Sequence, residues 1–133
     1  MERHGIGQEC PRKRALGRDY FCAVELALQV IGGKWKPLIV WRLGSAGVLR
    51  FGELHRLLPG VTRKMLTQQL RELEADGVVL RRAFAQVPAR VDYALTDLGR
   101  SAMPVLEQLG AWGRQLETND AANGAGRTAA GAA

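Results

Sequence analysis

Cysteine is scarce in this chain, and long apolar runs are absent. Its 133 residues include two cysteines, Cys10 and Cys22, without the spacing of a zinc site. This usage excludes a disulfide framework and suits a reducing compartment. No apolar run approaches the roughly 18 residues that span a bilayer, and no apolar secretion segment follows Met1. We therefore expect a cytoplasmic protein without a membrane partner.

The sequence also lacks the combinations of residues that form catalytic sites. His4 lies near the N-terminus, His55 has no pattern of Cys or acidic partners, and no glycine-rich phosphate loop follows a strand. We expect a protein that is not an enzyme, with no catalytic residue, no metal and no cofactor.

Acidic residues are fewer than basic ones. Lys and Arg number 19 against 13 Asp and Glu, giving a net charge of +6 and a pI near 10.0. Residues 34–95 hold eleven cations and five carboxylates, so this segment carries the whole excess. Such an excess favours a polyanionic partner or an acidic surface.

Both ends of the chain lack apolar periodicity. Residues 1–18 mix Gly, Pro and charge, and residues 118–133 are an Ala/Gly-rich stretch with little to bury. We expect a flexible arm over 1–18, a single domain over 19–117, and a disordered tail over 118–133. A hydrophobic content of 47% is enough for one core.

Four helices are predicted before residue 78. Val24, Leu28 and Ile31 recur at helical spacing, and a second helix starts near Pro37. A third covers about 51–58 and ends at the Pro59–Gly60 break. The fourth begins after Thr62 as N-cap, with Val61 and Leu66 as a hydrophobic staple. It buries Leu66, Leu70 and Leu73 and ends at Gly77.

Two strand-like runs follow the fourth helix. Residues 78–85 and 90–95 are joined by the loop 86–89, which predicts a hairpin, or wing. Thr96 caps a last helix that bends at Pro104. Its apolar stripe is long for a small domain, so part of it needs a partner subunit. The fold class is mainly α with a small β-hairpin: a winged helix-turn-helix with extra terminal helices.

The polar face of the fourth helix suits DNA. Arg or Lys can donate to guanine, Gln can pair with adenine, and the Thr methyl can meet thymine. The predicted base-contacting residues are Arg63, Lys64, Thr67 and Gln68. Arg71 is more suited to a phosphate, and the N-cap residue Thr62 is also counted among the DNA-binding residues. The same pattern also describes the solvated face of an ordinary amphipathic helix. The Pro-Gly break, the staple and the basic hairpin favour DNA.

Further cations lie around this helix. Arg81, Arg82 and Arg90 flank the wing loop and suit the DNA backbone or the minor groove, with Arg90 the strongest candidate because it lies beside the tip. Phosphate contacts are also predicted for Lys34, Lys36, Arg50 and Arg56. Ordinary solvated surface charge is the alternative for each of these peripheral cations.

Six segments together resemble the HxlR-type winged helix-turn-helix transcription regulators, within the MarR-like superfamily. They are CAVE at 22–25, IGGKW at 31–35, RFGEL at 50–54, LPGVT at 58–62, LRELEADG at 70–77 and YALTDLG at 93–99. The resemblance covers about residues 22–113. It implies a homodimer formed through the first and last helices, which binds a two-fold symmetric operator on double-stranded DNA and represses or activates nearby genes.

The implied dimer agrees with the long apolar stripe. The interface candidates, which a monomer core could also use, are Val24, Leu28, Leu106, Leu109, Trp112 and Leu116.

Some members of the family sense oxidants, quinones or aldehydes through a cysteine just before the first helix, where Cys22 stands here. The family's Cys-Pro is Cys22–Ala23 in this chain, and the C-terminal half has no cysteine. Any disulfide must therefore join Cys22 to its mate, to Cys10 or to a small thiol. Alternatively, Cys22 is chemically inert, and the regulator either responds to a small-molecule ligand of unknown identity or has no sensing role.

The rival functional class is a protein of the same fold that binds nucleic acid without sequence preference or acts as an adaptor.

Overall fold

Three central helices pack around one apolar core in the computed structural model, which describes residues 12–131. They are α2 (Trp35–Ala46), α3 (Phe51–Arg56) and α4 (Arg63–Ala75). Each buries one side. The fully buried side chains are Ile39, Val40 and Leu43 from α2, Leu54 from α3, and Leu66, Leu70 and Leu73 from α4. The predicted inner face of the fourth helix is therefore confirmed.

The start and the end of α4 follow from local chemistry. The Thr62 hydroxyl accepts a hydrogen bond from the Met65 N–H at 3.0 Å, as expected of an N-cap. Gly60 in the preceding turn and Gly77 after the helix have φ of 94° and 79°, a backbone region that suits glycine. Val61 and Leu66 both join the core. The predicted helix-turn-helix is present.

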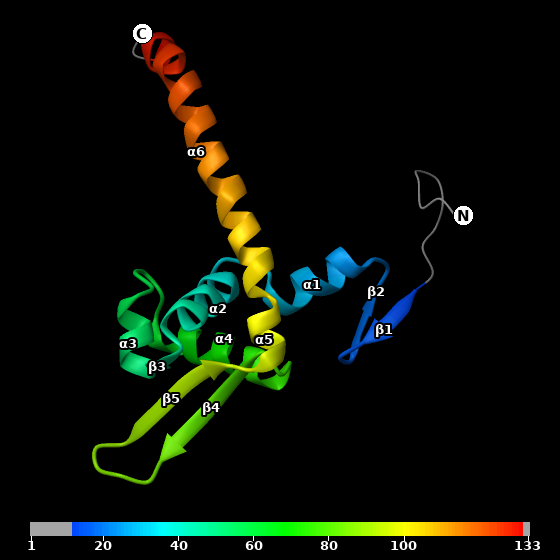
Figure 1. Ribbon diagram of the computed structural model, residues 1–133, viewed down its shortest axis with the longest axis vertical. Coiled ribbons are helices and arrows are strands. Elements are labelled where there is room, and N and C mark those ends of the chain that lie inside the picture. Colours follow the sequence, from blue (N-terminus) through cyan, green and yellow to red (C-terminus); the bar gives the residue numbers. More distant parts are fainter. Residues whose placement is uncertain (1–11, 132–133) are drawn as a thin grey trace.

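A three-stranded antiparallel sheet completes the domain, in the order β3 (Val48–Arg50), β5 (Arg90–Leu95), β4 (Val79–Phe84). Leu80 and Val48 both pair with Ala94, and Arg82 and Arg50 both pair with Asp92. Strands β4 and β5 project from the body as the predicted wing (Figure 1).

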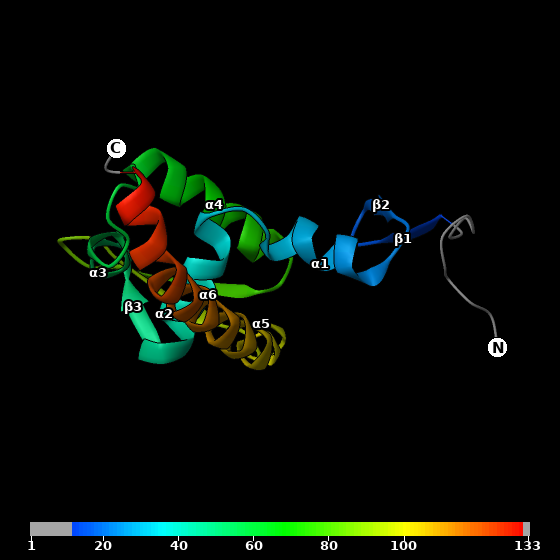
Figure 2. The same ribbon diagram turned by 90° about the horizontal axis from the view of Figure 1, so that it is seen from above.

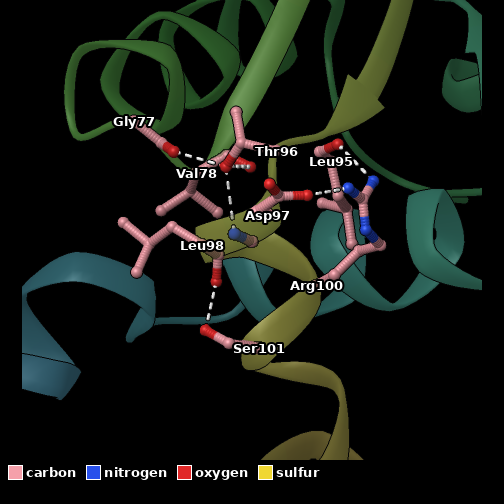
Figure 3. A network of polar contacts seen from close by, with 9 residues as sticks. Gly77, Val78, Leu95, Thr96, Asp97, Leu98, Arg100 and Ser101 are labelled. Carbon is pink, nitrogen blue, oxygen red and sulfur yellow. Dashed lines mark hydrogen bonds and ion pairs between the residues drawn. The ribbon is translucent and has the colours of Figure 1, made fainter.

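Thr96 joins the base of the wing to the end of α4. Its hydroxyl lies 2.5 Å from the Gly77 carbonyl oxygen and accepts from the Gly99 N–H at 3.0 Å (Figure 3). It thereby caps the short helix α5 (Asp97–Ser101), as predicted. Arg100 in the same network donates to the Leu95 carbonyl at 3.1 Å. The wing is thus fixed relative to α4.

The last helix differs from the prediction in two ways. The break falls at Ala102, between α5 and α6 (Met103–Gly131), and not at Pro104. Pro104 lies in the first turn of α6, where proline removes no helical hydrogen bond. Helix α6 also continues through most of 118–133, where we predicted a disordered tail. The abundant alanine there has the highest helix propensity of any residue.

The N-terminal segment also differs from the predicted flexible arm. Strands β1 (Lys13–Ala15) and β2 (Arg18–Tyr20) pair around a turn at Leu16 and Gly17, both with positive φ. The positive φ values match a two-residue hairpin turn. Arg18 anchors the hairpin to Asp76 through two hydrogen bonds of 2.8 Å. This partner is distant in sequence, so composition alone did not predict the hairpin.

Two elements stand away from the domain. Helix α1 (Ala23–Ile31) has no buried residue, and with the β1–β2 hairpin it extends to one side of the body (Figures 1 and 2). Helix α6 rises from the end opposite the wing (Figure 1). Within residues 12–131, no helix combines the length and hydropathy needed to cross a bilayer.

Candidate nucleic-acid interface

The outer face of α4 carries a row of cations. Arg63, Lys64, Gln68 and Arg71 are exposed, while Leu66, Leu70 and Leu73 on the opposite side are at most 1% exposed. Within residues 12–124, none of these three cations forms an ion pair. Arg63 lies over the Phe51 ring at 5.3 Å, which holds its guanidinium near the start of the helix. The helix therefore presents uncompensated positive charge to solvent.

Two of the predicted DNA-binding residues use their hydroxyl groups within the helix. The Thr62 hydroxyl is the N-cap acceptor, and the half-buried Thr67 donates to the Arg63 carbonyl oxygen at 2.8 Å. Both side chains lie at the predicted position. Their hydrogen-bonding capacity serves first to fix the helix.

Gln68 is held by a neighbour. Its Nε2 donates to Glu72 Oε2 at 2.8 Å, and Glu72 Oε1 lies 2.6 Å from Lys36 Nζ. The predicted phosphate contact of Lys36 is wrong, because its residue is 8% exposed and its ammonium group faces Glu72. The hydrogen bond from Lys36, and then that from Gln68, lower the pKa of Glu72.

The wing holds its arginines around one carboxylate. Arg90 donates to both oxygens of Asp92, at 3.0 and 2.9 Å, and this pairing lowers the pKa of Asp92. Arg82 and Arg90 both lie over the Phe84 ring, at 5.2 and 4.5 Å. Arg50 and Arg82 flank Asp92 across the sheet. Arg90 is the strongest predicted DNA contact of the wing. The Asp92 carboxylate holds its guanidinium group in place and neutralises part of its charge.

Two hollows lie between the helices and the wing. One, of about 280 Å³, has Arg71 and Arg81 in its lining, together with Phe51 and Tyr93. The other, of about 330 Å³, lies between the start of α3 and the wing tip, and its lining includes Arg50, Arg56 and Arg90. Of the remaining predicted cations, Lys34 lies over the Trp35 ring at 4.7 Å and lines neither hollow. The two hollows therefore contain five of the predicted cations, which are Arg50, Arg56, Arg71, Arg81 and Arg90.

His55, expected from the sequence to be a surface or phosphate-contacting residue, is instead half-buried beside the turn. His55 hydrogen-bonds the Val61 carbonyl in the turn at 2.9 Å, so its Nε2 is the donor. It also stacks on Phe51, with ring centroids 6.3 Å apart. The contacts of Asp92 and Phe84 with the wing arginines could not be predicted from the sequence, because they depend on the register of β4 and β5.

The apolar candidates separate into two groups. Val24, Leu28, Leu109, Trp112 and Leu116 are 48–68% exposed, but Leu106 is 7% exposed and packs in the core. Leu106 is therefore part of the monomer core and not of an exposed surface. The exposed stripe on α6 follows Val105, Leu109, Trp112 and Leu116, with Val105 in place of the predicted Leu106.

Cys22 stands at the N-cap of α1. Its thiol is exposed, is not part of a disulfide and makes no capping hydrogen bond. Its backbone carbonyl accepts a hydrogen bond from the Leu26 N–H at 3.2 Å. Cys10 lies outside the described residues. The described residues also contain no group of His, Cys, Asp and Glu side chains that suits a metal ion.

The arrangement of α3, the Pro-Gly turn, α4 and a basic β-hairpin defines a winged helix-turn-helix. The chain belongs to the HxlR-like helix-turn-helix family, which it matches over residues 30–121. It is therefore a DNA-binding transcription regulator, and not an enzyme.

Relatives and solved structures agree with this assignment. The HTH-type transcriptional regulator YtcD of Bacillus subtilis is 53% identical over 96 residues, 72% of this chain and 75% of YtcD. The redox regulator HypR in its oxidized form is 48% identical, with a TM-score of 0.66 and coverage of 71% of this chain and 96% of HypR. Diamide-treated YodB from B. subtilis is 33% identical, with a TM-score of 0.59 and coverage of 71% and 93%.

Proposed function

We propose that the protein binds a two-fold symmetric DNA operator in a sequence-specific manner, as a homodimer. The observation that carries this proposal is the outer face of α4, where Arg63, Lys64 and Arg71 lack ion-pair partners within residues 12–124. In this proposal the N-terminal half of α4 enters the major groove, and the wing follows the backbone. Thr62, Thr67, Arg50, Arg56, Lys34 and Arg82 complete the proposed contact set.

Sequence specificity is tested by competition. The full chain is used to select duplexes from a randomised library, and its Kd for the selected duplex is compared with that for random duplex at one salt concentration. A specific regulator prefers the selected duplex by about 10³-fold or more. Equal affinities would leave a nonspecific nucleic-acid binder or an adaptor.

The dimer proposal depends on apolar side chains that the monomer leaves exposed. Val24 and Leu28 on α1 and Leu109, Trp112 and Leu116 on α6 remain open to solvent. Exposed apolar surface of this extent marks an interaction surface. In the proposed dimer the two α4 helices lie about 34 Å apart, because two half-sites of an operator are separated by one turn of DNA.

Sedimentation measurements test the dimer. We expect the wild-type chain to sediment as a dimer and the Leu109→Glu/Trp112→Glu variant as a monomer. Leu80→Glu is the matched control, since Leu80 is similarly exposed but lies on the wing. A monomeric wild-type chain at micromolar concentration would contradict the proposal.

We further propose that Cys22 responds to oxidants or electrophiles. Two observations support this proposal. Cys22 is exposed at the N-cap of α1. Similar solved structures include the redox regulator HypR and the diamide-treated YodB. Diamide takes up two protons and two electrons as two thiols become a disulfide. The second thiol comes from the partner's Cys22, from Cys10 or from a small thiol.

The thiol proposal is tested with Cys22→Ser and Cys10→Ser. We expect diamide to change the DNA affinity of the wild-type protein and not that of Cys22→Ser. Nonreducing gels and intact mass then distinguish the three thiol partners. An unchanged diamide response in Cys22→Ser would remove this residue from sensing and leave control by a small-molecule ligand, or no sensing.

A further inference from the structure

A chain of three polar side chains joins the core helix α2 to the exposed face of α4. Lys36 Nζ lies 2.6 Å from Glu72 Oε1, and Gln68 Nε2 donates to Glu72 Oε2 at 2.8 Å. The two carboxylate oxygens therefore bind two different donors. One donor is almost buried, and the other faces the proposed DNA side.

Lys36 is a fixed anchor for this chain. Its side chain is 10% exposed, and Ile39 and Val40 on the same helix are fully buried. A buried ammonium group without a partner is costly, so the pairing with Glu72 is strongly favoured. Because the pKa of Glu72 is lowered by these hydrogen bonds, the carboxylate is ionised at neutral pH. Glu72 is then an acceptor only.

The ionised carboxylate determines which end of the Gln68 amide faces it. A carboxamide has one acceptor oxygen and two N–H groups. An acceptor-only partner at 2.8 Å requires that the amide nitrogen points toward Glu72. One N–H is thereby occupied, while Oε1 and the second N–H are available to another partner.

These two remaining groups match adenine. In the major groove adenine offers the N7 acceptor and the N6 donor, whereas guanine offers two acceptors, N7 and O6. A freely rotating carboxamide can turn both N–H groups toward guanine. A carboxamide held by Glu72 can offer only one, and its oxygen then meets the guanine O6. The restraint thus penalises guanine more than adenine.

We infer that Lys36 and Glu72 are positioning residues that orient Gln68 and so give the protein a preference for adenine over guanine at the base that Gln68 faces. This inference rests on the proposed sequence-specific DNA binding. It adds a determinant of base preference that does not itself touch DNA.

The test uses a duplex that the wild-type chain selects from a randomised library, and variants of that duplex with one base pair changed. Gln68→Ala first identifies the position that Gln68 contacts. At that position we expect wild-type protein to prefer adenine over guanine by on the order of tenfold or more. We expect Glu72→Ala to reduce this ratio to about twofold. Glu72→Gln should reduce it as well, because its single oxygen accepts from Lys36 and its NH2 group then faces Gln68, whose amide must turn its oxygen inward.

Glu74→Ala is the matched control. Glu74 lies on the same helix and carries the same charge, but it lines the hollow with Arg71 and Arg81 and does not contact Gln68. Both Glu→Ala variants should shift nonspecific affinity in the same direction, because both remove one negative charge. Only Glu72→Ala should change the adenine-to-guanine ratio.

Double substitution separates positioning from a structural role. If Glu72 acts through Gln68, the ratio of Gln68→Ala/Glu72→Ala equals that of Gln68→Ala alone. Thermal unfolding by circular dichroism verifies that each variant folds. Lys36→Met is a further variant, but the comparison of Glu72→Ala with Glu74→Ala decides the matter if Lys36→Met does not fold.

The outcomes are distinct. If the wild-type chain enriches no sequence, the proposed function fails and this inference fails with it. If it enriches a sequence but Glu72→Ala keeps the wild-type ratio, or the double variant is additive, only the inference is overturned. A position sensitive to Gln68→Ala that favours guanine in the wild type would also overturn it.

Discussion

The recognition helix α4 and the wing both present arginines, but they hold them differently. On α4, Arg63 and Arg71 have no carboxylate partner within residues 12–124, whereas Arg90 on the wing binds Asp92 through two hydrogen bonds. Two carboxylates at the C-terminal end of α4 instead bind cations of other elements: Glu72 pairs with Lys36, and the C-cap residue Asp76 pairs with Arg18.

This difference separates two tasks. Because Glu72 is anchored to α2 and Asp76 to the β1–β2 hairpin, neither carboxylate neutralises Arg63, Lys64 or Arg71, and these cations are free to contact DNA. Pairing Arg90 with Asp92 fixes the guanidinium and reduces its net charge, which suits a phosphate contact of modest strength. We therefore expect α4 to determine base preference and the wing to contribute affinity without preference.

The largest expected effect concerns the packing beneath α4. Leu70 is 1% exposed in the core, so Leu70→Ala should lower the free energy of unfolding by about 2–5 kcal/mol. Leu80→Ala on the outer face of the wing, where Leu80 is 57% exposed, should change it by about 0.5 kcal/mol or less. Urea denaturation measures both. Similar losses would mean that the wing is packed as tightly as the helix.

Arg90→Ala should weaken binding to every duplex. We expect the slope of log K against log salt to become shallower by about one unit while the ratio of specific to random affinity stays constant. Arg90→Lys keeps the charge and should retain most of the salt slope. Filter binding or fluorescence anisotropy at several salt concentrations measures this. A selective loss on the selected duplex would contradict the division of tasks.

Thr62→Ala should cost about 1 kcal/mol of stability, because the Met65 N–H loses its N-cap acceptor. Thr67→Ala is the matched variant, since its hydroxyl donates to a carbonyl within the helix and satisfies no orphan N–H group. Thermal unfolding of the two variants compares them. If Thr67→Ala is the more destabilising, the assignment of Thr62 as the structural cap is wrong.

The smallest expected effect is pH dependence. Ion pairing and hydrogen bonding lower the pKa of both Glu72 and Asp92 in the folded chain. The stability they contribute is therefore present above about pH 5 and is lost as the pH falls through their lowered pKa values. The Asp92→Asn variant should lose less stability than the wild type between about pH 5 and 3. An identical pH profile would show that the Arg90 pair adds nothing to folding.

Much of α4 could be predicted from the sequence because its determinants are local. The Thr62 cap, the spacing of Leu66, Leu70 and Leu73, and the glycine at 77 lie within one helix and its turns. The strands of the wing were predictable for the same reason. Periodicity and turn residues suffice where the interacting groups are neighbours in sequence.

The remainder depends on contacts between distant segments. Arg18 and Asp76 are 58 positions apart, and their pairing orders a hairpin that composition alone marked as flexible. Lys36 resembles a surface cation until α2 packs against α4. Leu106 shares its spacing with the exposed stripe of α6, and only the packing against the core separates the two.

The most direct test of the central claim is one binding comparison at fixed salt. The Kd for the selected duplex and for random duplex is measured for wild type, Gln68→Ala and Arg90→Ala. We expect a wild-type ratio of about 10³ or more, a smaller ratio for Gln68→Ala, and an unchanged ratio with weaker absolute binding for Arg90→Ala. Equal losses on both duplexes for Gln68→Ala, or a reduced ratio for Arg90→Ala, would contradict the claim that α4 specifies sequence and the wing does not.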